Sequence, residues 1–158
     1  MAALAKLFDP RTVLLAKHAQ HVVFVHFPIA LTMTAIGFEW VAAWRPGTMG
    51  AALAEAAYWN LTAAAATALA AVATGLAAWQ WELEGIPLRN TLLLHAIFGG
   101  ASAGAIVLLW WLRARGRRQP ATSRGVAYFG LTVVVFAVVA VTGHLGGFVS
   151  GVNTLVGP

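Results

Sequence analysis

The segment HVVFVHFPIALTMTAIGFEWVAAW, residues 21–44, decides the fold of this chain. Its part at residues 22–44 is almost entirely apolar and is long enough to cross a bilayer, which takes about 20 helical residues. Similar segments follow at residues 56–79, 91–112 and 126–146. Short stretches with turn-forming or charged residues separate them. The pattern predicts an all-α integral membrane protein, an up-and-down antiparallel bundle of four transmembrane helices.

The composition agrees with a membrane protein. Of 158 residues, 60% are hydrophobic and 9% are charged, whereas soluble domains carry about 25% charged residues. The chain contains no cysteine, which excludes disulfides, thiolate metal ligands and c-type haem attachment through the chain itself. Half of the ten basic residues fall in one short loop. Since no basic face extends beyond that loop, we expect no binding to nucleic acid.

The chain divides into a short flank and one membrane domain. Residues 1–20 are interrupted by charges and a proline, so they lack the apolar run of a signal peptide. We expect this flank to be irregular or to form an interfacial helix on the membrane. Residues 21–158 then form the four-helix domain, which leaves no room for a second domain.

The arginine-rich loop between the third and fourth spans predicts the orientation. Positive residues favour the cytoplasmic side of a membrane. Both termini and the loop at residues 80–90 would then lie in the periplasm. We therefore expect a multi-pass protein of the bacterial inner membrane, in contact with membrane lipid.

Four histidines lie near the span ends that share the periplasmic side. His21 and His26 stand at the start of the first span, His95 lies about a turn into the third, and His144 lies near the end of the fourth. Because odd and even spans run in opposite directions, all four fall in one layer. Ionisable groups at membrane depth usually face the bundle interior. We therefore expect these histidines to converge.

The spacing of His21 and His26 bears on that convergence. Residues five apart on an ideal helix point about 140° away from each other. Pro28 suggests a solution, because proline favours the first turn of a helix. If the regular helix begins near Phe27, His26 belongs to the capping region and His21 to a flank that can turn inward.

Small residues accompany the two deeper histidines. Gly99 follows His95 by one helical turn, and Gly143 is adjacent to His144. Such residues leave room for a large, flat ligand, or allow another helix to pack closely.

Glu39 lies near the cytoplasmic end of the first span. We expect its side chain to snorkel towards the surface, and a role in proton relay is the alternative.

Haem b held between two histidines on different helices suits a bundle without cysteine. We predict one haem, or two, ligated by two of His26, His95 and His144, with His21 as a fourth ligand or as a hydrogen-bond donor beside the site. The favoured pair is His26 with His95, which would span the bundle diagonally. The remaining histidines would then contact propionates or a quinone.

Two polar residues precede the third span. Arg89 and Asn90 are candidates to bind haem propionates or a lipid headgroup, or to serve as interfacial anchors.

Two alternatives to a haem protein also remain. One is a histidine-lined protein that binds or transports copper, zinc or iron. The other is a membrane anchor without a cofactor that docks a larger complex.

Several motifs resemble a family of bacterial four-span membrane proteins, the domain of unknown function 2231. The resemblance covers nearly the whole chain from about residue 18, and it rests on HFPIAL at 26–31, ATGLAAW at 73–79, His95, and TGHLGG at 142–147. It implies a partner among periplasmic redox proteins, such as a cytochrome c, a Rieske protein or a dehydrogenase, or a respiratory complex. We expect an electron-transfer subunit between quinone and that partner rather than an enzyme acting alone.

Overall fold

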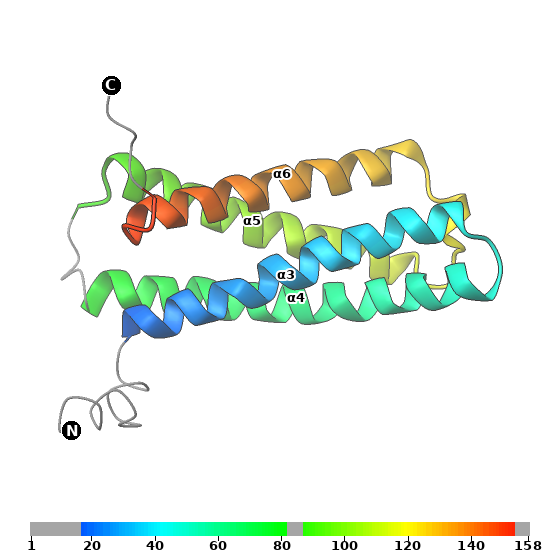
Figure 1. Cartoon of the computed structure of the whole chain (residues 1–158), viewed down its shortest axis with the longest axis horizontal. Helices are drawn as coiled ribbons and strands as arrows, with labels where there is room; N and C mark the ends of the chain where they lie inside the picture. The colour runs from blue at the N-terminus through cyan, green and yellow to red at the C-terminus, as the bar shows by residue number, and fades with distance from the viewer. Residues whose placement is uncertain (1–16, 82–86, 154–158) are drawn as a thin grey trace.

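The computed structural model describes residues 17–81 and 87–153, which form a bundle of four long helices (Figure 1). In chain order, the long helices are α3 (Lys17–Trp44), α4 (Thr48–Trp81), α5 (Asn90–Arg115) and α6 (Val126–Val149). A 3₁₀ helix, η1 (Ala121–Ser123), precedes α6, and the described residues include no strand. All four long helices are long and apolar enough to cross a membrane, which confirms the predicted all-α four-span bundle.

The helices form two antiparallel pairs. α3 packs closely along α4, and α5 packs along α6; α4 and α5 join the two pairs on one side. α3 and α6 are in contact over a shorter length on the other side. α3 and α5 therefore face each other diagonally across the bundle.

The core of the bundle consists largely of small residues. α4 buries a stripe that repeats every three or four residues, made of Ala57, Leu61, Ala64, Ala68 and Ala71. Alanine at these positions allows neighbouring helices to approach closely, which is how helices associate in lipid. The buried residues packed on this stripe come from the other three helices and include Ala35, Ile106, Leu109, Val135 and Val139.

The first two helices begin earlier than predicted. α4 begins at Thr48 rather than at residue 56, after a turn in which Gly47 adopts a positive φ of 85°. Pro28 lies in the interior of α3 rather than in its first turn, so the expectation of a helix beginning near Phe27 is wrong. Proline is tolerated inside transmembrane helices, where neighbouring helices supply packing around the missing hydrogen bond.

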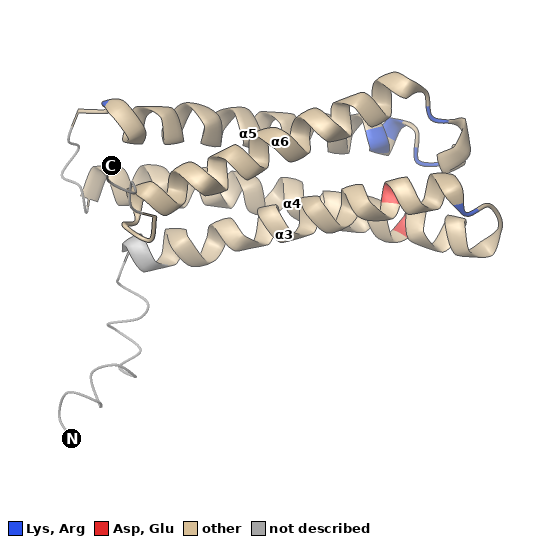
Figure 2. Cartoon of the chain, turned by 45° about the horizontal axis from the view of Figure 1, so that its top comes forward, with Lys and Arg blue, Asp and Glu red and all other residues tan. Residues whose placement is uncertain are grey.

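Most of the charged residues that the structure describes gather at one end of the bundle, and Arg89 lies at the other (Figure 2). This arginine-rich end carries both acidic residues of the described chain, Glu39 and Glu55, and six arginines: Arg45, Arg113, Arg115, Arg117, Arg118 and Arg124. The positive-inside rule predicts that it faces the cytoplasm. The described parts of the segments that we predict to be periplasmic lie at the opposite end. Residues 82–86 and most of the 1–20 flank fall outside the described residues.

Candidate functional site

His21 and His95 meet near the end of the bundle opposite the arginines. Their ring centroids are 6.4 Å apart, and the ring planes are inclined by 74°. His21 belongs to α3 and His95 to α5, so the pair spans the core between diagonally opposed helices. We expected a diagonal pair from the first and third spans, but with His26 in the place of His21.

α4 holds the ring of His21. The imidazole Nδ1 lies 3.2 Å from the hydroxyl oxygen of Thr74. The ring also packs against Gly75, where an added Cβ would come within 2.9 Å of the imidazole Cε1. Gly75 therefore provides the space that the ring occupies, and the Thr74 hydroxyl orients it.

α6 holds the ring of His95 in a similar way. An added Cβ at Gly146 would lie 3.2 Å from the imidazole Cε1. The buried Nδ1 of His95 lies on the side of the ring that faces α6, near Gly146 and within reach of the backbone of Thr142. A ring held through Nδ1 leaves Nε2 as the candidate ligand atom.

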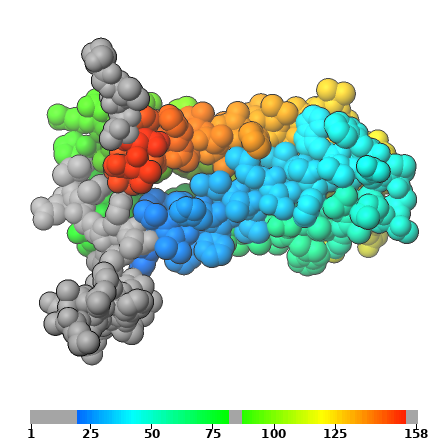
Figure 3. Space-filling model, viewed as in Figure 1, coloured from blue at the N-terminus to red at the C-terminus, as the bar shows by residue number. Residues whose placement is uncertain are grey.

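The two imidazoles border a cavity of about 230 Å³, which we call the histidine cavity. Its other walls are almost entirely apolar, and many of the lining residues are small: Ala68, Ala71, Gly75, Ala96, Gly99, Gly100 and Ala103. Gly99, which we singled out beside His95, is thus part of the wall. The cavity is partly open to the outside, and the molecule is hollowed between the start of α3 and the end of α6 (Figure 3).

Ser102 and Thr142 add a polar contact to this cavity. Their hydroxyl oxygens are 2.7 Å apart, and both residues line the wall. Ser102 lies on α5 and Thr142 on α6, so the hydrogen bond joins these helices deeper in the bundle than the two histidines.

His26 does not reach the histidine cavity. Its side chain is exposed on the outside of the bundle, and Nδ1 lies 2.6 Å from the carbonyl oxygen of Val22 in the same helix. α3 is regular throughout this region, so His21 and His26 diverge as residues five apart on a helix must. The expected convergence of both residues is therefore not found.

His144 also lies outside the cavity. It is exposed, and its ring packs edge-on against Phe148 at a centroid distance of 5.0 Å. The residue of α6 that faces His95 is Gly146. Since residues two apart on a helix point in nearly opposite directions, His144 is turned away. Only two of the four predicted histidines come together.

The remaining predicted site residues lie apart from the histidine cavity. Arg89 is the exposed N-cap residue of α5, and Asn90 follows it with a φ of 50°. Gly143 faces α3, where an added Cβ would contact Ile29 at 3.8 Å. None of the three lines the cavity.

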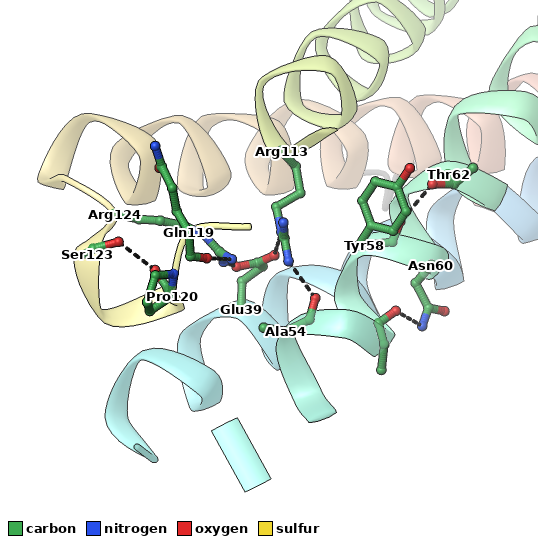
Figure 4. Close-up of polar contacts among 11 residues, drawn as sticks. Glu39, Ala54, Tyr58, Asn60, Thr62, Arg113, Gln119, Pro120, Ser123 and Arg124 are labelled. Carbon is green, nitrogen blue, oxygen red and sulfur yellow. Dashed lines mark hydrogen bonds and ion pairs between the residues drawn. The ribbon is translucent and has the colours of Figure 1, made fainter. Parts of the chain in front are cut away.

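A buried ionic cluster at the arginine-rich end was missed by the sequence reasoning (Figure 4). Glu39 is fully buried; its Oε1 accepts a 2.7 Å hydrogen bond from Arg113 Nε, and its Oε2 pairs with Arg124. Arg113 Nη2 also donates to the carbonyl oxygen of Ala54 at 2.7 Å. The expectation that Glu39 snorkels is wrong, because arginines on both sides of the α5–α6 loop neutralise it inside the bundle. The available signal was an acidic residue within an apolar span, at the same membrane level as several arginines.

Comparison with known proteins identifies a family. Neither the curated proteins nor the solved structures gave a match to this chain. The family model described as "Predicted membrane protein (DUF2231)" matches residues 17–154. This range includes all four long helices. The chain therefore belongs to the DUF2231 family of predicted membrane proteins.

Proposed function

We propose that this protein is an electron-transfer subunit of the membrane, and that it binds haem b in the histidine cavity through His21 and His95. The observation that carries the proposal is the spacing of the two imidazoles. Two imidazoles that bind one metal ion from opposite sides, at metal–nitrogen distances of about 2.0 Å, have ring centres about 6 Å apart. The rings of His21 and His95 are 6.4 Å apart.

The surroundings of the two rings also fit axial ligation. The Thr74 hydroxyl lies beside His21 Nδ1, and a hydrogen bond of this kind typically sets the tautomer and orientation of a metal-ligating histidine. The backbone of Thr142 beside His95 can orient that ring in the same way and leave its Nε2 to a ligand. Gly99 and Gly100 in the wall leave room beside it for a flat group.

The volume of the histidine cavity indicates how large a ligand it can hold. Small-molecule sites usually measure about 300–1,000 Å³, and the histidine cavity measures about 230 Å³. Because it opens to the outside, this volume sets no upper limit on a ligand that extends beyond the opening. When bound, haem b would supply one-electron transfer, and the apolar walls would exclude water from it.

The proposed electron partners are a quinol or quinone and a periplasmic redox protein. His21 and His95 border the histidine cavity near the starts of α3 and α5, at the end of the bundle opposite the arginine-rich end, and the positive-inside rule predicts that this end faces the periplasm. Such a position supports exchange of electrons with a cytochrome c, a Rieske protein or a dehydrogenase subunit at the outer surface.

The small volume of the histidine cavity also favours a second candidate function, in which the cavity binds the quinone ring itself. In that case the imidazoles of His21 and His95 would donate hydrogen bonds to the quinone oxygens, and no haem would be needed. A site for a bare metal ion has less support. The described part of the chain contains no group of three or more histidine, cysteine, aspartate or glutamate side chains that could hold one.

A visible spectrum of the purified protein tests the proposal. The full chain would be expressed with haem available, purified in mild detergent, and examined by a reduced-minus-oxidised spectrum and a pyridine haemochrome assay. We expect a sharp α band and close to one haem per chain. Organic extraction of the same sample, followed by chromatography, would detect a bound quinone.

Two results would decide against the haem proposal. A featureless spectrum from folded protein with a stoichiometric quinone would establish the second candidate in its place. A featureless spectrum with no extracted quinone would favour the membrane anchor. Folding would be checked by circular dichroism and by a symmetric gel-filtration peak.

A further inference from the structure

A second cavity lies at the arginine-rich end, where the α3–α4 turn meets the loop before α6. It has a volume of about 340 Å³, and we call it the arginine pocket. One acidic residue, Glu55, lines the pocket. Four arginines also line it: Arg45, Arg113, Arg117 and Arg118. The pocket is distinct from the histidine cavity and has no role in the proposed electron transfer.

The pocket carries surplus positive charge. Glu55 is already paired with Arg117 at 2.6 Å, and Glu39 is occupied by Arg113 and Arg124. Within the described residues no acidic side chain therefore remains for Arg45 and Arg118. Their charges are available to an anion that enters the pocket.

Arg113 supplies an unmet hydrogen-bond donor. The residue is 2% exposed, and its Nε and Nη2 donate to Glu39 and to the Ala54 carbonyl. Its Nη1 is buried and has no hydrogen-bond partner in the described parts of the chain. This third nitrogen of the guanidinium can therefore donate a hydrogen bond to an anionic oxygen.

The beginning of α4 contributes to the same wall. Gly47, Gly50 and Ala51 line the pocket at the start of this 34-residue helix. An added Cβ at Gly50 would collide with the Arg45 carbonyl oxygen, so glycine allows the turn to close tightly here. The positive end of a helix dipole favours anions, and phosphate groups in particular.

We propose that the arginine pocket binds a phosphate group. The ligand chemistry is a phosphate mono- or diester whose oxygens pair with Arg113 Nη1, Arg45 and Arg118. The pocket lies where the apolar helices end, which is where a bilayer would place lipid headgroups. Basic pockets between transmembrane helices bind acidic headgroups in other proteins. A free phosphate or small phosphorylated solute offers the same oxygens and is the other source.

Binding measurements on the full chain in neutral detergent test this proposal. Native mass spectrometry would count retained phosphatidylglycerol, with phosphatidylcholine as the zwitterionic comparison, and ³¹P NMR would measure binding of inorganic phosphate. The test variant is Arg45→Gln combined with Arg118→Gln. The matched control is Arg115→Gln, because Arg115 lies at the same end, stacks on Trp111 at 3.7 Å and does not line the pocket.

We expect the double variant to weaken binding by more than about tenfold, because it removes two charge-assisted donors to the phosphate oxygens inside the pocket. The control should stay within about twofold of the unmodified protein, since it is outside the pocket. Retention of phosphatidylglycerol that inorganic phosphate displaces assigns the pocket to a lipid headgroup. Binding of inorganic phosphate without selective retention of the lipid assigns it to a free phosphoanion.

Two outcomes would overturn the proposal. One is equal loss of binding in the double variant and in Arg115→Gln, which would mean that general surface charge is responsible. The other is no binding of either probe by protein that is folded. Arg45 and Arg118 are both exposed, so the double variant is expected to fold, and circular dichroism would verify it.

Discussion

Glu39→Gln would remove the negative charge that Arg113 and Arg124 share inside the bundle. Glu39 is 0% exposed and Arg113 is 2% exposed, so water cannot replace the lost partner. The glutamine oxygen can still accept one hydrogen bond, but two guanidinium charges would then face a neutral group. This variant therefore leaves buried charge uncompensated, which is the costly way to break an ion pair.

The expected destabilisation follows from that burial. Breaking a buried ion pair by removing one partner costs about 3–5 kcal/mol. For a chain of this size each kcal/mol lowers Tm by about 2–4 °C, so the variant should melt about 6–20 °C below the unmodified protein.

Thermal unfolding in mild detergent, followed by circular dichroism at one fixed scan rate, measures this shift. Glu55→Gln is the matched control. It makes the same chemical change opposite Arg117, but the side chains of that pair are 48% and 43% exposed. Surface pairs contribute little, so the control should melt close to the unmodified protein.

Similar melting temperatures for Glu39→Gln and Glu55→Gln would refute this reasoning. They would mean that Glu39 is hydrated, or that the two arginines find other partners at little cost. A large shift in Glu55→Gln alone would refute it equally.

Three further variants probe the histidine cavity. Gly75→Ala places a Cβ 2.9 Å from the His21 ring, so it should displace the imidazole and lower the haem-to-protein ratio in a pyridine haemochrome assay. Thr74→Val removes the hydroxyl 3.2 Å from the same ring and should change the haem reduction potential, measured by redox titration, more than the haem content. Ser102→Ala removes the 2.7 Å hydrogen bond to Thr142 and should destabilise the bundle by about 0.5–1.5 kcal/mol, measured by thermal unfolding.

Hydropathy and topology were enough to predict the four-helix fold and the end of the bundle at which the histidines meet. Four apolar segments were enough to predict four antiparallel helices, and alternating direction was enough to place a histidine of the first span near one of the third. Both features depend on position along the membrane normal, which a sequence determines well because a span has a nearly fixed length.

Rotation of the helices about their axes was harder to predict. The choice between His21 and His26 depended on where α3 becomes regular, and Pro28 wrongly suggested a late start. The hydrophobic residues surround each helix, since lipid and core are both apolar, so their pattern does not show which face turns inward. The burial of Glu39 against Arg113 was missed for the same reason.

The haem content of four single variants is the measurement that tests the central claim most directly. If His21 and His95 ligate the haem, His21→Gln and His95→Gln should each lose it, while His26→Gln and His144→Gln, whose side chains are exposed, should keep close to one haem per chain. Loss of haem in His26→Gln or His144→Gln, with full retention in His21→Gln, would contradict the proposed axial pair.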